Sequence, residues 1–460
     1  MKEKNKNIRR EINYLDKKVV VFANDNIYEN QKDLDDVLIQ AKNIFSIPSV
    51  YDKVFLMPDF HKGYGFPIGG VGAFENVISP GGIGYDVNCG VSLFFVELSK
   101  EKILSKKDEL IEKISKNIGI GFGSKGNFNL DFNRVCIEGL KYLKDIGIVN
   151  DNDIKNTNFN GSFKGSLEFV SNEAILRGKR TLGSLGAGNH FVDLMDVSDI
   201  NKDNNYEILD KNIFKGKKGI LLMIHTGSRG FGHQIISDYI SKIRDLNIDN
   251  FENLKEKDLA YISKDSSMFN EFVLSMNSAC NFAFVNRRLI FEGFKKVLED
   301  LYGEFYSSLI YDISHNIATF EKHFGKDLIV HRKGATLALG GKNFKHDYYK
   351  NQPIIIPGSN ATSSYLLFGL ENDSSLSLQS CCHGSGRSVS RKYANENYDI
   401  IDIKKDFRKK GIIFYSASKD SVLEESFLSY KDSKDVVETI IDSGIATMGV
   451  RFEPFIVFQG

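Results

Sequence analysis

The chain has 460 residues, and its 60 Lys and Arg residues are balanced by 60 Asp and Glu residues, so the formal net charge is zero. Bulk charge therefore predicts no polyanionic partner, and binding of nucleic acid would have to depend on a local basic surface. Hydrophobic residues make up 42% of the chain, which supports a substantial buried interior. The longest apolar run, Gly219–Ile224, is far too short to cross a membrane.

The sequence shows neither the pattern of a signal peptide nor a linker between domains. Residues 1–10 are basic but are not followed by the apolar run of a signal peptide. The odd number of cysteines, five, favours a reducing compartment, so we expect a cytoplasmic protein. No Pro-, Gly- or Ser-rich linker divides the chain. We expect a basic N-terminal segment over residues 1–18 and a single catalytic domain over residues 19–460.

The predicted elements mix strands and helices without regular alternation, which favours an α+β fold over a doubly wound sheet. Strand-like runs occur at Lys18–Phe22, Lys53–Met57, Val91–Val96, Gly219–Ile224, Pro353–Pro357 and Pro454–Phe458. Helical periodicity is clearest at Lys32–Phe45, Lys102–Ile118, Ser267–Tyr302 and Asp435–Ser443. Residues 150–165, rich in Asn and Asp, are predicted to form a surface excursion.

The first two glycine-rich segments carry residue types that bind transition metals. Met57-Pro-Asp-Phe-His-Lys-Gly contains Asp59 and His61, and Ser79-Pro-Gly-Gly-Ile-Gly-Tyr-Asp-Val-Asn-Cys-Gly contains Asp86 and Cys89. Carboxylate, imidazole and thiolate are the usual ligands of such metals, and glycines let the backbone turn tightly around an ion. For any one of these residues alone, a turn or core role is the better interpretation.

Four further segments of the same character follow downstream. Each places a histidine among small or polar residues: His190 in Leu-Gly-Ala-Gly-Asn-His, His225 at the end of a strand, His315 in Ser-His-Asn, and His383 in Cys-Cys-His-Gly-Ser-Gly. The Ser314–Asn316 segment is predicted to begin a helix that also carries Glu321 and His323. Arg229, four residues after His225, could hold a phosphate with its planar guanidinium.

Together these residues predict a binuclear metal site. Asp86 and Cys89 with three histidines make five ligands, which suits two metal ions that keep open positions. His383 is followed by Arg387 and Arg391, four apart on what we predict to be the start of a helix. This arrangement suits a nucleophile that attacks a phosphoryl group. Spacing alone leaves both a binuclear hydrolase and a nucleotidyl transferase open.

The segments resemble the RtcB family of RNA-splicing ligases. The matching stretches, in family order, are MPDFHKGYGFPIGG, SPGGIGYDVNCG, LGSLGAGNHF, HTGSRGFGHQ, SHNIA, HRKGAT, PGSNATSSY, CCHGSGR and YKDSKDVVETIIDSGIA. The resemblance implies an α+β fold of the RtcB type, with mixed sheets, surrounding helices and a central metal-lined cleft. It also implies a GTP- and manganese-dependent enzyme that joins an RNA 3′-phosphate or 2′,3′-cyclic phosphate to a 5′-hydroxyl, in RNA repair or tRNA splicing.

Site roles follow from the same resemblance. It implies a covalent guanylate on His383 oriented by Asp59, and two Mn²⁺ ions that share Cys89. The implied metal ligands are Asp86, Cys89, His190, His225 and His315. The implied nucleotide-binding residues are Asn189, Asp193, His315, Asn316, Pro357, Gly358, Ser359, Ser364, His383, Gly384, Ser385, Gly386, Tyr430 and Gln459. The implied RNA-binding residues are Arg229, Arg387 and Arg391. Manganese rests on the family, because thiolate and imidazole ligands would ordinarily favour zinc.

The chain departs from the family pattern near the expected base pocket. The family usually has Glu at position 193 and Lys at position 459, and its nucleotide loop differs at Asn360, Ala361 and Ser363. These departures leave two alternatives: a homologue with altered nucleotide preference, and a metal-dependent RNA phosphodiesterase or cyclic-phosphate hydrolase that no longer ligates. We expect a monomer, RNA as substrate, no membrane association and a possible requirement for an archease-type activator.

Overall fold

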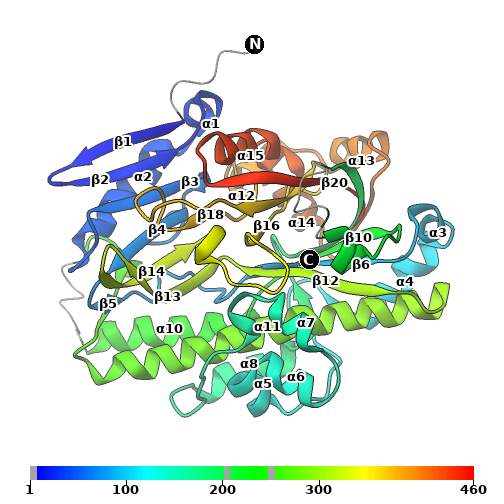
Figure 1. Cartoon of the computed structure of the whole chain (residues 1–460), viewed down its shortest axis with the longest axis horizontal. Coiled ribbons are helices and arrows are strands. Elements are labelled where there is room, and N and C mark those ends of the chain that lie inside the picture. Colours follow the sequence, from blue (N-terminus) through cyan, green and yellow to red (C-terminus); the bar gives the residue numbers. More distant parts are fainter. Residues whose placement is uncertain (1–7, 201–206, 208, 247–253) are drawn as a thin grey trace.

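The computed structural model describes residues 8–200, 207, 209–246 and 254–460 (Figure 1). One mixed sheet has six strands in the order β1-β2-β3-β4-β14-β13. Its strands are β1 (Arg9–Tyr14), β2 (Lys17–Phe22), β3 (Lys53–His61), β4 (Ile68–Phe74), β13 (Asn316–His323) and β14 (Lys326–Lys333). β2 and β3 are parallel, and the other pairs are antiparallel.

A larger sheet has eight strands and forms the centre of the molecule. Its path runs β12-β6-β10-β9-β20-β17-β16, and β19 pairs with β20 in parallel. These strands are β6 (Gly90–Val96), β9 (Phe191–Ile200), β10 (Ile220–Thr226), β12 (Ser307–Ser314), β16 (Pro353–Ile356), β17 (Ser364–Gly369), β19 (Ile413–Ser416) and β20 (Ala446–Gln459). Short pairs are formed by β5 (Val77–Ile78) with β11 (Ile262–Ser263), β7 (Gly119–Ile120) with β8 (Ser184–Gly186), and β15 (Ala335–Leu337) with β18 (Ser380–Cys382).

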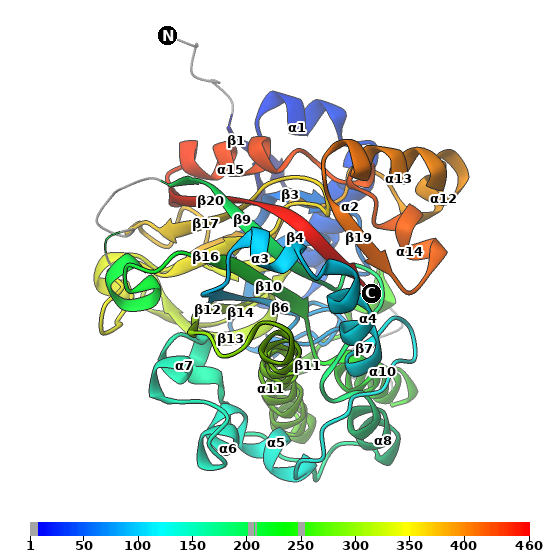
Figure 2. The same ribbon diagram turned by 90° about the vertical axis from the view of Figure 1, so that its right-hand side faces the viewer.

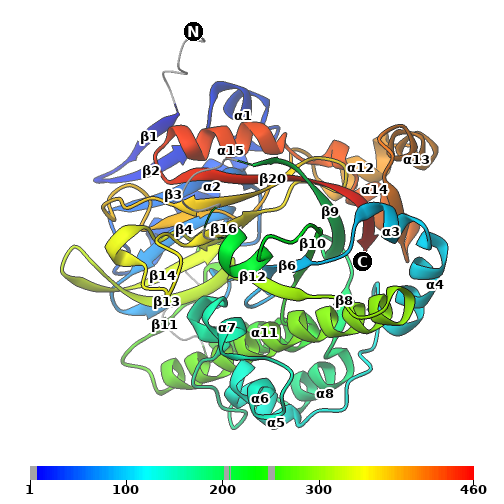
Figure 3. The same cartoon turned by 45° about the vertical axis from the view of Figure 1, so that its right-hand side comes forward.

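Helices cover the sheets on both sides (Figures 1 and 3). They are α1 (Asp25–Asn30), α2 (Leu34–Asn43), α3 (Lys100–Leu104), α4 (Lys107–Asn117), α5 (Phe132–Glu138), α6 (Leu140–Asp145), α7 (Asp151–Lys155), α8 (Asn172–Thr181), α10 (Arg229–Asp245), α11 (Ser267–Tyr302), α12 (Arg391–Asn397), α13 (Ile400–Lys409), α14 (Lys419–Glu424) and α15 (Ser433–Asp442). Single helical turns lie at Ile44–Ser46, Asn158–Gly161, Asp210–Phe214, Lys257–Leu259, Gly341–Asn343 and Phe427–Ser429. The α+β class expected from the sequence is confirmed.

The long helix α11 runs beneath the sheets and is seen end-on in Figure 2. Ser266 caps its start by accepting a hydrogen bond from the Met268 amide, and Gly303, with φ of 82°, ends it. Most of its side chains are buried, which is why its apolar period is strong in the sequence. In the part of the chain that the structure describes, no helix combines the length and apolar character needed to cross a membrane.

Three local predictions are wrong. Residues 102–118 form two helices, α3 and α4, because the chain turns at Ser105 and Lys106. Asn316–His323 is strand β13, not a helix, because it pairs along its whole length with β14. Residues 150–165 are not a surface excursion. Their α7 and the following turn are tied to β12, where the Asn156 amide donates to the Leu309 carbonyl at 2.8 Å.

Part of the basic N-terminal segment belongs to a sheet. Residues 1–7 lie outside the described residues, whereas Arg9–Tyr14 forms β1 and pairs antiparallel with β2. The Arg10 guanidinium donates to the Ala23 carbonyl and forms an ion pair with Asp25. This segment therefore forms an edge strand of the six-stranded sheet.

Candidate metal centre and nucleotide cavity

The strand register of the eight-stranded sheet gathers the candidate metal ligands at one edge. β10 and β12 flank β6 and run antiparallel to it, so Gly90 lies opposite both Thr226 and Ser314. The start of β6 therefore meets the ends of its two neighbours. On the other side of β10, Phe191 at the start of β9 pairs with His225. The residues brought together in this way are Cys89, His190, His225 and His315.

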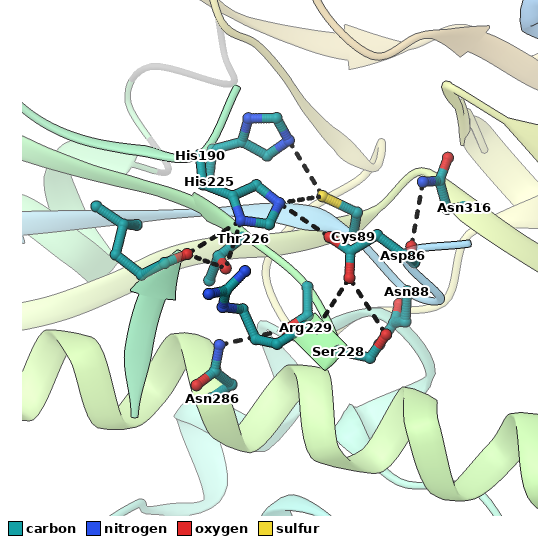
Figure 4. Close-up of polar contacts among 12 residues, drawn as sticks. Asp86, Asn88, Cys89, His190, His225, Thr226, Ser228, Arg229, Asn286 and Asn316 are labelled. Atoms are coloured by element: carbon teal, nitrogen blue, oxygen red, sulfur yellow. Dashed lines mark hydrogen bonds and ion pairs between the residues drawn. The ribbon is translucent and has the colours of Figure 1, made fainter. Parts of the chain in front are cut away.

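Together with Asp86, these residues place their donor atoms in two groups that share Cys89. Figure 4 shows Asp86, Cys89, His190 and His225. In one group the Cys89 Sγ lies 3.3 Å from the His225 Nε2, which lies 3.2 Å from the His315 Nε2. In the other group the Cys89 Sγ lies 3.6 Å from the His190 Nε2, which lies 2.9 Å from an Asp86 carboxylate oxygen. Within each group all donor atoms lie within 4.8 Å of one another.

Neighbouring groups orient these ligands. The His190 Nδ1 lies 3.0 Å from the Leu185 carbonyl, and this contact orients the ring so that Nε2 faces the cluster. The Arg229 backbone amide donates to an Asp86 carboxylate oxygen at 2.9 Å. Gly227 permits this approach, because a Cβ at that position would lie 2.6 Å from the Asp86 carboxylate.

The electrostatics of the cluster suit a cation. Burial lowers the pKa of His225 and of His315, which keeps both imidazoles neutral, and raises the pKa of the Cys89 thiol. Burial also opposes ionisation of Asp86, but the contact with His190 lowers the pKa of this carboxyl to about 2. Neutral imidazoles, a carboxylate and a thiol that a metal would deprotonate form a donor set that fits transition-metal ions.

Helix α11 supports the cluster from below through two residues that the sequence analysis did not single out. The fully buried Arg287 forms a bidentate ion pair with Asp312 and donates to the backbone carbonyls of Asn88 and Thr226. The Asn286 amide donates to the Gly227 carbonyl at 3.2 Å. Asn286 and Arg287 interrupt the largely apolar stretch Phe282–Phe291 of this helix, and that interruption was the available signal in the sequence.

His383 faces the same cluster and is held by Asp59. The His383 Nδ1 donates to the Asp59 carboxylate, and the His383 backbone amide donates to the same oxygen at 2.9 Å. The His383 and His315 rings lie 4.7 Å apart, centroid to centroid. With Nδ1 protonated, the His383 Nε2 keeps its lone pair. His61 belongs to neither ligand group; its Nδ1 donates to the Asp59 carbonyl.

Lys431 lies behind this pair and was also not singled out in the sequence. Its ammonium donates to the Pro58 and Phe60 carbonyls, which flank Asp59, and lies 4.1 Å from the centroid of the Phe60 ring. Burial lowers the pKa of Lys431 to about 7, although the Asp59 carboxylate opposes this change. The buried Lys431 amine therefore braces the end of β3 that presents Asp59 to His383.

A cavity of about 1420 Å³ opens beside the cluster. It is lined by the five candidate metal ligands, by His383 and by most of the predicted nucleotide-binding residues, namely Asn189, His315, Asn316, Pro357, Gly358, Ser359, Gly384, Ser385, Gly386, Tyr430 and Gln459. Two predicted nucleotide-binding residues lie behind its wall. Asp193 is buried in β9, and the Ser364 hydroxyl accepts a hydrogen bond from the Gly358 amide at 2.9 Å.

All three candidate RNA-binding arginines line the cavity, but they differ in whether their guanidinium groups already have partners. Arg387 pairs with Glu425 and also donates to the Glu424 carbonyl, and Arg391 pairs with both glutamates. The predicted shared helix is wrong, because α12 begins only at Arg391. The Arg229 Nε has no hydrogen-bond partner among the described residues although it is buried. Arg229 is therefore the arginine most available to an anion.

Comparison with known proteins gives one consistent result. The sequence model of the family described as tRNA-splicing ligase RtcB matches residues 40–460. The chain is 37% identical to the tRNA-splicing ligase RtcB of Thermococcus kodakarensis, over 98% of this chain and 98% of that protein. It is 38% identical to that of Nanoarchaeum equitans (96% and 95%) and 36% identical to the RNA-splicing ligase RtcB homolog 1 of Entamoeba histolytica (92% and 83%). The chain therefore belongs to the RtcB family.

Proposed function

We propose that this protein is an RNA ligase that joins a 3′-phosphate or 2′,3′-cyclic phosphate end to a 5′-hydroxyl end, with GTP as the activating nucleotide. The observation that carries the proposal is the His383 imidazole, which Asp59 holds in place and which faces a cluster of metal-binding donors inside one cavity. The names of the relatives, which are tRNA-splicing ligases, support RNA as the substrate and tRNA processing as the setting.

The cluster supports two metal ions, which we assign as Mn²⁺. Asp86, Cys89 and His190 would hold one ion, and Cys89, His225 and His315 would hold the other. When bound, these ions would supply positive charge that neutralises phosphate oxygens. The unpaired Arg229 Nε adds a fixed positive charge on the same side of the cavity.

The residues of this chain support a reaction in three displacements. The His383 Nε2 attacks the α-phosphorus of GTP, a P–N bond forms, and pyrophosphate leaves. An oxygen of the RNA 3′-phosphate then attacks the same phosphorus, breaks the P–N bond and takes the GMP. Finally the 5′-hydroxyl oxygen attacks the RNA phosphorus, and GMP leaves with the bonding electrons. A cyclic phosphate would first be opened by water.

Asp59 stabilises the positive charge that develops on the His383 imidazole during the first displacement. Its carboxylate accepts from Nδ1 and from the His383 backbone amide, which fixes both the tautomer and the ring orientation. Gly386 packs closely against the backbone of β3 at Asp59, because a Cβ there would lie 2.0 Å from the Asp59 carbonyl oxygen. The nucleophile is therefore positioned from two sides.

A covalent labelling assay tests this proposal. Incubation with Mn²⁺ and GTP labelled at the α-phosphorus should transfer label to the protein, and His383→Ala should abolish the transfer. His346→Ala is the matched control, because His346 lies outside the cavity lining and should leave labelling intact. A labelled His383→Ala variant, or no label with any nucleoside triphosphate, would reject the mechanism.

A relaxed nucleotide preference is a second candidate, favoured by the geometry around positions 193 and 459. The Asp193 carboxylate does not line the cavity, and burial raises its pKa well above the usual range. The Gln459 amide is already used, because it donates to the Gly188 carbonyl at 2.6 Å and to the His190 carbonyl at 3.1 Å. Neither side chain is therefore available to form a strong hydrogen bond with the edge of the nucleotide base.

Labelling with each of the four nucleoside triphosphates measures this preference. We expect GTP to label best but with reduced discrimination, since one bidentate base contact is worth about 1–3 kcal/mol. The double variant Asp193→Glu, Gln459→Lys should sharpen selection of GTP by about tenfold or more. Equal selectivity in both proteins would show that these two positions do not determine it.

Partners follow from the same proposal. We propose that the enzyme acts as a monomer and that an archease-type activator accelerates its turnover. Multiple-turnover ligation measured with and without such an activator, on enzyme of known molecular mass in solution, tests both statements. Full activity that appears only in a dimeric fraction would contradict the monomer.

A further inference from the structure

Exposed aromatic side chains gather at the mouth of the cavity. Five large aromatic side chains are well exposed among the described residues. Three of them, Tyr64 (72% exposed), Phe122 (98%) and Tyr393 (37%), line the cavity; the other two, Phe320 and Phe324, do not. Leaving aromatic rings in water is unfavourable, so their concentration around one opening indicates a binding surface.

The three rim aromatics, Tyr64, Phe122 and Tyr393, come from separate segments. Tyr64 lies in the loop between β3 and β4, Phe122 in the turn after β7, and Tyr393 in α12. Figure 2 shows β7 and α12 on the same side of the molecule. Phe122 stands between Gly121 and Gly123, whose positive φ angles of 97° and 72° shape a turn that holds the ring outward.

Two cations lie near the rim aromatics, one at the Tyr393 ring and one at the backbone next to Phe122. The Arg180 guanidinium donates to the Gly123 carbonyl at 3.3 Å, next to Phe122. The Lys32 ammonium lies 3.9 Å from the centroid of the Tyr393 ring. Neither cation has an ion-pair partner among residues 8–200, 207, 209–246 and 254–460. Each therefore offers its charge to a ligand.

The cavity as a whole is basic although the chain is neutral. Its lining contains eight Lys and Arg residues against four Asp and Glu residues, whereas the whole chain contains 60 of each. At about 1420 Å³ it also exceeds the roughly 300–1,000 Å³ of an ordinary small-molecule pocket. The opening can therefore accommodate more than a nucleotide, and its charge favours a polyanion.

We propose that the rim aromatics stack on unpaired bases of the RNA on either side of the break, while Arg180 and Lys32 contact the adjoining phosphates. The proposal rests on the proposed ligase function and extends it: the enzyme would take ends that are single-stranded. Faces of bases in a duplex are covered by their neighbours, so only unpaired bases can use these rings. A protein partner would instead favour a contiguous apolar patch, and these rings are dispersed among basic groups.

Binding of single-stranded RNA tests the proposal directly. Fluorescence anisotropy would measure the Kd of a labelled single-stranded RNA with a 3′-phosphate, for the natural chain and for the triple variant Tyr64→Ala, Phe122→Ala, Tyr393→Ala. Each lost base stack is expected to weaken binding by about fivefold or more. The triple variant should therefore lose about 100-fold or more, and KM for RNA in ligation should rise in parallel.

Matched controls separate stacking from general damage. Phe320→Ala with Phe324→Ala removes two other exposed rings (55% and 47% exposed) outside the cavity and should leave the RNA Kd unchanged. The conservative triple variant Tyr64→Phe, Phe122→Tyr, Tyr393→Phe keeps the rings and should keep the affinity. Covalent labelling of His383 by GTP should persist in every variant, because the rim lies outside the proposed transfer chemistry.

Two outcomes would overturn the proposal. The first is an unchanged affinity for single-stranded RNA in the alanine triple variant. This result would overturn the proposal even if the rim bound another macromolecule. An equal loss of affinity for a fully paired, nicked duplex is the other, because it would remove the role of unpaired bases. A chain that takes no label from GTP, yet loses single-stranded RNA affinity in the triple variant, would reject the ligase mechanism and retain the binding surface.

Discussion

Cys89 is the residue on which both candidate metal groups depend. Its Sγ lies near the Nε2 atoms of His190 and His225, which belong to different groups. We therefore expect Cys89→Ala to reduce bound Mn²⁺ from two ions per chain to nearly none. His190→Ala and His315→Ala should each remove about one ion, because each belongs to a single group. Equilibrium dialysis with metal analysis would measure these stoichiometries.

Cys136→Ala provides the control for loss of a buried thiol. Cys136 is fully buried, unpaired and outside both ligand groups, so its removal should cost stability without changing metal content. If Cys89→Ala kept one tightly bound ion, the sulfur would serve only one group and the shared-ligand arrangement would be contradicted.

Lys431 should make the free energy of unfolding depend on pH, and the direction of this dependence follows from its lowered pKa. Burial lowers its pKa in the folded chain to about 7, from the 10.5 of an exposed lysine. Between these two values the unfolded chain binds more protons than the folded chain, so the contribution of Lys431 to the free energy of unfolding rises with pH. From pH 7 to pH 9 we expect a gain of about 2 kcal/mol relative to Lys431→Met.

Urea unfolding of both proteins at pH 7, 8 and 9 isolates this effect, since the other titrating groups are common to the two chains. Lys434→Met is the control, because Lys434 is an exposed lysine only three residues away. A difference between the natural chain and Lys431→Met that does not change with pH would show that Lys431 titrates outside this range.

At the scale of elements, α11 and the central sheet hold the cluster together through Arg287. Its guanidinium reaches Asp312 in β12 and two carbonyls beside the ligands. Arg287→Met would leave the Asp312 carboxylate buried without its partner, and we expect it to lower the free energy of unfolding by about 3–5 kcal/mol. The midpoint of urea unfolding measures this loss.

Two further variants test whether the unpaired Asp312 carboxylate causes the loss of stability in Arg287→Met. Arg134→Ala breaks a surface network with Glu138 and Asp145 and should cost at most about 1 kcal/mol. Arg287→Met with Asp312→Leu removes both charges and should recover much of the loss. If the double variant were as unstable as Arg287→Met, lost packing rather than the unpaired carboxylate would be the cause.

Elements with a strong local signal were predicted well from the sequence. The helix predicted at Ser267–Tyr302 matches α11, because its buried stripe runs the whole length. The predicted strands match β2, β3, β6, β10, β16 and part of β20. β13 was missed because its conformation depends on pairing with β14. The predicted exposure of residues 150–165 was wrong because the polar Asn156 and Asn158, which follow α7, are buried through tertiary hydrogen bonds.

In the candidate site, too, residues with a local sequence signal were predicted, and residues that act through tertiary contacts were not. Scarce His and Cys residues among glycines, with the resemblance, identified the cluster and His383. Arg287, Asn286 and Lys431 were not found, because each acts on backbone carbonyls contributed by distant segments. The pairing of Arg387 and Arg391 with Glu425 likewise depends on segments about 35 residues apart, which no local spacing indicates.

At the scale of the whole molecule, net charge and local charge differ. Equal numbers of acidic and basic residues predict no long-range attraction to RNA, yet the cavity lining has a twofold excess of basic residues. The excess is concentrated around an opening that also carries the rim aromatics. Attraction should therefore act over the short distance set by salt screening, about 8 Å at physiological ionic strength.

This difference predicts how RNA binding responds to salt. Each phosphate of a single strand that a cation contacts contributes about −0.7 to the slope of log affinity against log salt concentration. With Arg229, Arg180 and Lys32 as the available cations, we expect a slope of roughly −2. Arg180→Ala should reduce its magnitude by about 0.7, whereas Arg134→Ala, in α5 and outside the cavity lining, should leave it unchanged. A slope near zero would mean that stacking alone holds the RNA and that the basic lining serves only the nucleotide.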